Sequence, residues 1–467
     1  MAKDFIVAIE LGSSKMTGIA GRKNPDGSIS ILAVAKEDSA SYIRKGVAYN
    51  IERTAQGLSN IVSKLKNTLK TEIEQVYVGI GGQSIHSVKN SIVKELPLDC
   101  IVSQDMVNEL MDTNRSMEYK DCEILDAITQ EYNVDGHYED DPVGIQARHL
   151  EGNFLNVLWR RSFYRNLNKS LDNSGIKVAE MYLAPLTMAD CVLTDAEKRA
   201  GCVLVDLGAD TTTVSVYYRN KLRHIAVLPL GGSNVTKDLE SLQIDEINAE
   251  AMKLKHASAL TNEKDIDAEA TLPIGDGRTI RSCMFIQVVE ARMLEIVENV
   301  KYLVPHEFAD KLLGGIVLTG GGSNMKNVEK LFREVFGAEK VRIAKSTTLN
   351  INKKDSDVIL SEDGTTNTIL GLLAKGDMNC AGRAISETLF DEEEEPGSEN
   401  TVSLDPTLAA TGTGAQPAAQ TAAQPAANAA EEEEEKAPEP HKPTKISRFF
   451  GSLKKFGSSI FEPDVNE

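Results

Sequence analysis

The sequence has few of the features expected of a secreted, zinc-binding or nucleic-acid-binding protein. Its six cysteines are scattered over 467 residues without a CxxC pair, which favours a reducing compartment over a disulfide framework or a zinc site. Its 51 basic and 70 acidic residues give a net charge of −19, which argues against a general binder of nucleic-acid phosphates. We therefore expect no nucleic-acid partner.

Long apolar runs are also missing. The apolar run near the N-terminus is too short for a signal peptide and is soon interrupted by glycine and serine. No window approaches the roughly 18 apolar residues that are needed to span a bilayer. These observations predict a cytosolic main body.

The acidic excess is concentrated toward the C-terminus. Residues 391–440 contain thirteen acids and a single base, Lys436, and so contribute −12 to the net charge. The composition from 391 to 441 is mainly Ala, Pro, Gln, Thr and Glu, which cannot bury enough apolar area to offset the entropy lost on ordering. We expect a disordered acidic linker over 391–441.

Two stretches of the chain share one pattern. In AIELGSSK and in VDLGADTT, an apolar strand ends in an acid, followed by Leu-Gly, a small polar turn and a second strand. Glu10 and Asp206 hold equivalent places, 196 residues apart. A repeat of this size predicts two similar α/β halves, with a ligand cleft between them.

Other segments predict the elements around this repeat. Apolar residues at helical spacing predict a helix over 50–72, with Leu58, Ile61, Val62, Leu65 and Leu69 on one face. A weakly patterned region, 84–163, indicates an inserted subdomain, in which 128–144 is expected to be a loop because of its DG and DP turn signals. Further helices are expected at 249–260, 282–304 and 365–376.

The two repeated turns have a chemistry of their own. Backbone N–H groups of small residues suit phosphate oxygens, and an acid at each strand end can hold a divalent metal directly or through water. A single hairpin of this kind is common in proteins that bind no phosphate. Its repetition favours a site in which both turns bind a polyphosphate together with Mg²⁺. Two more glycine turns, at 231–233 and 320–322, precede predicted helices.

The order of these pieces resembles the actin-like ATPase superfamily, and within it is most similar to the FtsA family of bacterial cell-division proteins. The resemblance covers residues 4–380 and includes PLGGSNVTKDL, the AEAMK helix and VLTGGGSNM. It implies an α/β fold with two ribonuclease-H-like halves and an inserted subdomain. The implied subdomains are 1A at 1–83 and 164–198, 1C at 84–163, 2A at 199–236 and 314–385 (its last helix returning to 1A), and 2B at 237–313.

The resemblance also implies ATP and Mg²⁺ as ligands. Glu10 and Asp206 match the acidic positions that hold Mg²⁺ through water. The nucleotide-binding positions that it implies are Gly12, Ser13, Ser14 and Lys15 in loop one, Gly208, Ala209, Asp210 and Thr211 in loop two, Gly231 and Gly232 after it, Glu250 and Lys253 at the ribose, and Gly320, Gly321 and Gly322 at the adenine.

The sequence departs from the superfamily pattern in three places. Loop two reads GADT instead of GGGT, so that Asp210 places a negative charge near the phosphates unless it faces Mg²⁺ or solvent. Ala257 stands where the AEAMK helix usually continues to glycine. The stretch 182–194 has no Gln or His to position an attacking water, which predicts ATP binding with slow or negligible hydrolysis.

The last predicted element is an amphipathic helix at 442–467. Apolar side chains fall within an arc of about 140°, and basic residues lie outside it. Such a helix usually covers a core or docks in a partner groove, but the linker before it favours insertion into an anionic membrane surface. The predicted membrane-binding residues are Ile446, Arg448, Phe449, Phe450, Leu453, Lys454, Lys455, Phe456, Ile460 and Phe461.

Together these features predict a peripheral protein on the cytoplasmic side of the inner membrane at the division site. The resemblance implies that it forms filaments with itself, binds the C-terminal peptide of the tubulin-like protein FtsZ on residues 237–313, and works with other division proteins. Two alternatives share the same loops: a phosphotransferase or ATPase of the superfamily, and an actin-like protein of pilus assembly.

Overall fold

The computed structural model describes residues 4–262, 264, 267, 269–275, 277–352 and 360–384. The chain divides into two units, 1–391 and 392–467, and all the described residues belong to the first. The predicted linker and the predicted amphipathic helix lie outside the described residues.

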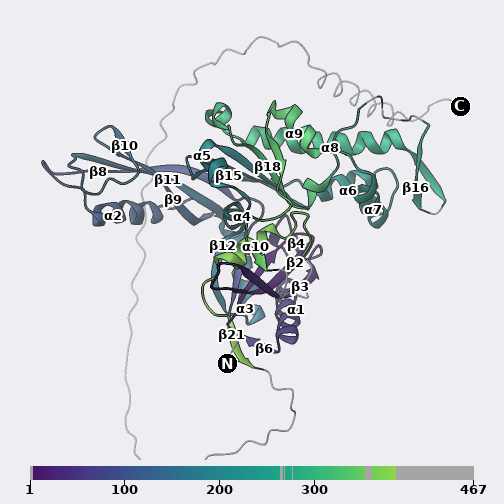
Figure 1. The fold of residues 1–467 in the computed structure, drawn as a ribbon, viewed down its shortest axis with the longest axis horizontal. Coiled ribbons are helices and arrows are strands. Elements are labelled where there is room, and N and C mark those ends of the chain that lie inside the picture. Colours follow the sequence, from purple (N-terminus) through teal and green to yellow (C-terminus); the bar gives the residue numbers. More distant parts are fainter. Residues whose placement is uncertain are drawn as a thin grey trace, which may run out of the picture. The chain divides into compact units, whose positions relative to one another are not determined.

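The first of the two large sheets is built around the first repeated hairpin (Figure 1). Its central strand β1 pairs with β2 on one side, with Glu10 opposite Thr17, and with β7 in parallel on the other. A central strand is covered on both faces, which explains the continuous apolar run of β1. The strand order is β12 (Val178–Leu183), β7 (Val76–Ile80), β1 (Ile6–Leu11), β2 (Lys15–Lys23), β3 (Ile29–Asp38), β20 (Ile351–Asn352).

Helices cover both faces of this sheet. On one face α1 (Ile51–Leu69) lies against Gly18 of β2 and beside α3 (Arg161–Ser174). On the other face α10 (Asn367–Lys375) packs on β1, β2 and β7 and against α4 (Ala184–Val192). The apolar face predicted for α1 is confirmed, because Leu58, Ile61, Val62 and Leu65 are buried and Leu69 is partly buried.

The second sheet contains both the second repeated hairpin and the inserted strands. Its order is β10 (His137–Glu139), β9 (Cys122–Val134), β11 (His149–Arg160), β8 (His86–Glu95), β15 (Lys221–Leu228), β14 (Thr212–Tyr218), β13 (Cys202–Leu207), β18 (Gly315–Thr319), β19 (Val341–Ile343). We call β8 to β11, together with α2 (Gln104–Arg115), the insert. The first sheet with its helices is the first half, and β13 to β15, β18 and β19 with their helices are the second half.

A mainly helical block belongs to the second half. It comprises α6 (Gly232–Glu240), α7 (Glu246–His256), α8 (Ser282–Leu303) and the hairpin of β16 (Thr271–Gly275) and β17 (Arg278–Arg281). The long helix is confirmed to within one residue, whereas the helix predicted over 249–260 begins at Glu246 and ends at His256. Asp245 caps its start by accepting from the N–H of Asn248, and Ala257 is extended.

The remaining elements are short or connect these layers. They are α5 (Asp195–Ala200), α9 (Val328–Phe336), the 3-10 helices at His306–Lys311 and Gly321–Asn324, and two small hairpins, β4 (Ile43–Arg44) with β5 (Val47–Ala48) and β6 (Thr71–Ile73) with β21 (Ala381–Ala384).

The prediction of a loop over 128–144 is wrong for 128–134, which lie in β9, and for 137–139, which form β10. Residues up to Val134 belong to β9, which lies between β10 and β11. Only the two residues Asp135 and Gly136 make the turn, and both have positive φ. Asp-Gly between two strands is the composition of a tight hairpin, so the DG signal marked a two-residue turn within a sheet.

One close helix contact gives a stability test. A Cβ at Gly371 of α10 would lie 2.5 Å from the carbonyl oxygen of Thr187 in α4. We expect Gly371→Ala to destabilise the protein by about 1–3 kcal/mol, because the obstacle is backbone that cannot rotate away. Denaturant unfolding measures this, with Gly81→Ala as control because a Cβ at that position would meet no atom within 4 Å. Equal stability of the two variants would contradict the tight packing.

Candidate functional site

The two repeated turns have the same local geometry. A Cβ at Gly12 would lie 2.5 Å from the carbonyl oxygen of Lys15, and a Cβ at Gly208 would lie 2.8 Å from that of Thr211. In both loops the chain therefore folds back so that the third residue after the glycine lies against it. The N–H of Gly208 donates to the carbonyl of Thr211 at 2.9 Å and closes loop two.

The acids before these turns lie close enough to interact. The pKa of Glu10 is raised to about 8, mainly by burial and then by the Asp206 carboxylate, while Lys15 and the Thr368 hydroxyl oppose the rise. Burial alone raises the pKa of Asp206 to about 6. Both residues keep partial contact with solvent. The structure thus brings together, from the ends of β1 and β13, the two acids that the sequence placed 196 residues apart.

The predicted adenine turn packs directly on Asp206. Gly320 has φ +81°, and a Cβ there would lie 2.3 Å from the Asp206 Oδ1 atom. A Cβ at Gly322 would lie 3.0 Å from Leu207. Gly321 has only Thr365 nearby. This turn therefore needs glycine because it lies against the strand end that carries the acid.

The remaining predicted residues form a support for loop two. The N–H groups of Gly232 and Ser233 donate to the carbonyls of Gly208 and Ala209 at 3.0 and 2.7 Å. A Cβ at Gly231 would collide with the same two carbonyls. The Lys253 ammonium donates to the Gly232 carbonyl at 3.0 Å.

The predicted pair on α7 is an ion pair. The Lys253 Nζ atom lies 2.6 Å from the Glu250 Oε2 atom, and both side chains contact the Thr236 hydroxyl. The Lys253 side chain is mostly buried and that of Glu250 is about half exposed. Glu250 is therefore the member of the pair that solvent, or a ligand, can reach.

A short turn of the first half contacts both loops. The N–H of Gly46 donates to the Ser13 hydroxyl at 2.8 Å, and the N–H of Lys45 donates to the Asp210 carboxylate at 3.1 Å. Asp210 thus faces a backbone N–H group of the opposite half. This contact explains how loop two accommodates an acid at a position where the superfamily has glycine.

Three further residues near the site were not found from the sequence. Ser39 donates its hydroxyl to the Gly12 carbonyl at 2.6 Å, and Thr368 hydrogen-bonds Glu10. The pKa of the Asp363 carboxyl is lowered against the effect of burial, mainly by hydrogen bonds from Thr365 and then from Ser361, with a smaller contribution from nearby Lys15. None of them belongs to a recognisable motif, because each reaches the loops only through the fold.

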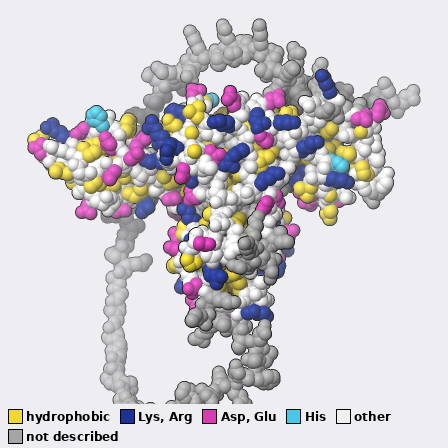
Figure 2. Space-filling view, viewed as in Figure 1, with side chains coloured by type: hydrophobic (Ala, Val, Ile, Leu, Met, Phe, Trp, Pro, Cys, Tyr) yellow, Lys and Arg dark blue, Asp and Glu magenta, His cyan; other side chains and the backbone are white. Residues whose placement is uncertain are grey.

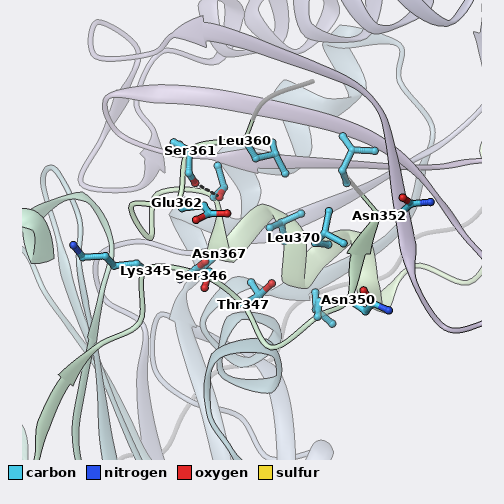
Figure 3. Close-up of a pocket in the computed structure, with 14 residues that line it drawn as sticks. Lys345, Ser346, Thr347, Asn350, Asn352, Leu360, Ser361, Glu362, Asn367 and Leu370 are labelled. Atoms are coloured by element: carbon cyan, nitrogen blue, oxygen red, sulfur yellow. Dashed lines mark hydrogen bonds between the residues drawn. The ribbon is translucent and has the colours of Figure 1, made fainter. Parts of the chain in front are cut away.

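A cavity of about 560 Å³ lies beside this site and is lined by none of the predicted residues. Figure 3 shows Asn367 and Leu370 of α10 facing the segments 345–352 and 360–362 across it. Thr366 and Asn367 line the cavity and directly precede Thr368, which contacts Glu10. The cavity therefore borders the start of α10, where the chain crosses from the second half to the first.

The two acids suit Mg²⁺ better than a metal held entirely by protein. The described residues contain no group of three or more His, Cys, Asp or Glu side chains that could hold a metal. Mg²⁺ is commonly held by one or two carboxylates together with water and substrate phosphates. The two neighbouring carboxyls fit that donor set.

Comparisons with known proteins identify the family. The family model "Cell division protein FtsA" matches residues 203–361, and the model of the SHS2 domain inserted in FtsA matches 82–158. The FtsA protein of Porphyromonas gingivalis is 31% identical over 380 residues, which cover 80% of this chain and 78% of the relative. The chain belongs to the FtsA family of cell division proteins.

Other relatives agree with this assignment. FtsA of Neisseria meningitidis is 29% identical over 71% of this chain and 82% of the relative. Among solved structures, the PilM–PilN type IV pilus biogenesis complex matches with a TM-score of 0.54 and 14% identity, over 79% of this chain and 97% of that one. The fold is the actin-like α/β fold with the insertion of FtsA. No helix in the described part of this FtsA chain could cross a bilayer.

The raised pKa of Glu10 predicts an unusual pH dependence. Folded Glu10 keeps its proton up to about pH 8, whereas the carboxyl of the unfolded chain loses it near 4.5. The folded state thus binds more protons in this range, and stability falls as pH rises through it. We expect Glu10→Gln to flatten the fall in melting temperature between about pH 5 and 8 in buffer without divalent cations.

Thermal melts across this pH range measure the effect. Glu334→Gln, at an exposed position of α9, is the control and should follow the parent protein. If Glu10→Gln and the parent lose stability with the same slope, then Glu10 does not hold a proton in the folded state.

Proposed function

We propose that this protein is an ATP-binding, actin-like component of the cell-division machinery that links an FtsZ polymer to the inner face of the cytoplasmic membrane. The observation that supports it best is the meeting of Glu10 and Asp206 between two equivalent glycine turns in a chain of the FtsA family. The proposal has three parts: the nucleotide site, the membrane anchor and the FtsZ tether.

The nucleotide would lie between the two loops. Backbone N–H groups of 12–14 and 209–211 would bind its phosphates, with Lys15 as a cation near the acids. Glu10 and Asp206 would hold Mg²⁺ through water, and the ion would neutralise charge on the phosphates. The half-exposed Glu250 carboxylate suits ribose hydroxyls, and Gly321, at which a Cβ would lie 3.6 Å from Thr365, leaves room for a flat base.

We expect hydrolysis of the bound ATP to be slow because of the residues of α4. The helix α4, APLTMADCV, contains no Gln or His, and its one carboxylate, Asp190, is paired with Lys198 and Lys375. It therefore offers no unpaired base to activate water toward the phosphates. Nucleotide would then act mainly as a structural ligand that favours self-association into filaments. A phosphotransferase, the alternative from the sequence, would need a general base that α4 does not supply.

The membrane anchor and the FtsZ tether rest on sequence and family. The segment 445–461 combines phenylalanines with four cations, which together suit an anionic membrane surface at about 1 kcal/mol per cation. The acidic residues of 391–440 would be repelled by the same lipid and would hold the body away from it. The FtsZ peptide would bind to residues 237–313, as the family resemblance implies.

Titration with a fluorescent ATP analogue tests the nucleotide site. We expect Lys15→Ala to weaken binding about tenfold to a hundredfold, since a hydrogen bond to a charged group is worth about 1.5–3 kcal/mol. Asp206→Asn should remove most of the Mg²⁺ dependence of binding. Lys36→Ala, on the exposed surface of β3, is the matched control. Parent-like affinity of Lys15→Ala would rule out this placement of the phosphates.

Sedimentation with anionic vesicles tests the anchor and the tether together. We expect the full chain to pellet with vesicles and to carry FtsZ with it, whereas a chain ending at residue 440 should stay in solution with FtsZ. Vesicles of neutral lipid are the control, because the cations of 445–461 gain little there. Equal pelleting of the full and shortened chains would refute the anchor. Pelleting of the full chain without FtsZ would refute the tether.

A further inference from the structure

The insert contacts both halves of the molecule, although its chain enters and leaves through the first half alone. It follows β7 of the first half, and β11 leads directly into α3 of the first half. Yet β8 lies next to β15 in one continuous sheet (Figure 1). The insert is therefore joined to the second half by strand pairing, although no covalent chain connection leads from one directly to the other.

The first contact between the insert and the second half is made by backbone. His86 of β8 pairs with Ala226 of β15. The N–H of Val227 donates to the carbonyl of Ile85 at 3.1 Å, and the N–H of Ile225 donates to the Ser87 hydroxyl at 3.0 Å. These bonds join the edge strand of the second half to the first strand of the insert.

The second contact centres on a buried amide. Gln130 of β9 is only 7% exposed. Its Nε2 atom donates to the carbonyl of Leu222 at 3.0 Å, and its Oε1 atom accepts from the Arg223 guanidinium at 3.1 Å. The Lys221 ammonium donates to its backbone carbonyl. One residue of the insert thus makes three hydrogen bonds with the beginning of β15.

Complementary charges surround this amide. The Lys221 ammonium lies 2.6 Å from the Asp140 carboxylate, and Arg223 lies 3.5 Å from Glu131. Here the second half supplies the cations and the insert supplies the acids. Figure 2 shows Lys and Arg side chains gathered at this junction, near α5 and β15.

The other end of the insert is fixed in the first half. Trp159 of β11 is 1% exposed, and its indole N–H donates to the Gln83 carbonyl at 3.0 Å. Leu155 and Val157 of the same strand lie in a buried cluster that contains most of the core of the first half and also Leu222 and Ile225 of β15. The insert therefore cannot follow the second half without disturbing a packed core.

We propose that the insert is a strap that holds the two halves together and limits their separation. If the halves separate, β15 must move away from the insert, or Trp159 of β11 must give up its buried place and its hydrogen bond to Gln83. The first motion breaks the hydrogen bonds to Gln130 and leaves buried polar groups unpaired, which costs free energy. The strap extends the proposed function. It rests on that function in one respect, because a nucleotide bound between the halves can leave only when the halves separate.

The double variant Lys221→Ala/Arg223→Ala removes the two cationic side chains of the strap, and Arg219→Ala, in the turn just before β15, is its control. Hydrogen–deuterium exchange follows two regions: the amides of Ile225 and Val227, and that of Lys45, which bonds Asp210 across the halves. We expect exchange at least about threefold faster in both regions of the double variant, with β13 unchanged. The Arg219→Ala protein should match the parent.

Two results would overturn the strap. One is unchanged exchange in both regions. The other is faster exchange at Ile225 and Val227 with Lys45 unchanged, because the contact would then be local and would not hold the halves. A faster exchange of β13 would indicate general loss of stability and also contradict the proposal.

Dissociation of a fluorescent ATP analogue is measured in parallel. We expect the nucleotide to leave the double variant at least about threefold faster than the Arg219→Ala control. Parent protein that binds no nucleotide would refute the proposed site but leave the exchange result as the test of the strap. Bound nucleotide that leaves both variants at the same rate would refute the strap.

Discussion

The arrangement of the site depends on one electrostatic constraint, the approach of Glu10 and Asp206. Each acid stands at the end of a central strand, β1 or β13, that is held by an antiparallel neighbour on one side and a parallel neighbour on the other. Neither strand end can retreat, so the Asp206 carboxylate adds to the cost of ionising Glu10. A cation placed between them would relieve that cost, which is the physical ground for the proposed Mg²⁺ at these acids.

The glycines around these acids have two separate causes. At Gly12 and Gly208 a Cβ would meet a carbonyl of its own turn, whereas at Gly320 it would meet the Asp206 carboxylate. Asp210 stands in loop two where the resemblance implies glycine, and its carboxylate is directed to the Lys45 amide of the opposite half. Asp210 thus adds a contact between the halves.

The sequence predicted the parts of this molecule that depend on neighbouring residues. The face of α1, the extent of α8 and the two repeated turns are local patterns, and their positions agree with the structure. Contacts made over long separations could not be predicted, such as Gln130 with Leu222 or Ser39 with Gly12. The error at 128–144 has the same origin, because a DG pair marks a turn without telling whether sheet continues on either side.

The strap and the two loops meet at one small hairpin, which gives their coupling a direct physical basis. The Lys45 carbonyl accepts from the N–H of Gln83 at 2.8 Å, while Gly46 and Gly82 lie so close that a Cβ on either would fall 2.5 Å from the other's backbone. The same turn donates to Ser13 and Asp210. Gln83 in turn accepts from Trp159 at the root of the insert. If the strap and the two loops are coupled as proposed, a displacement of either would pass through this turn and Gln83.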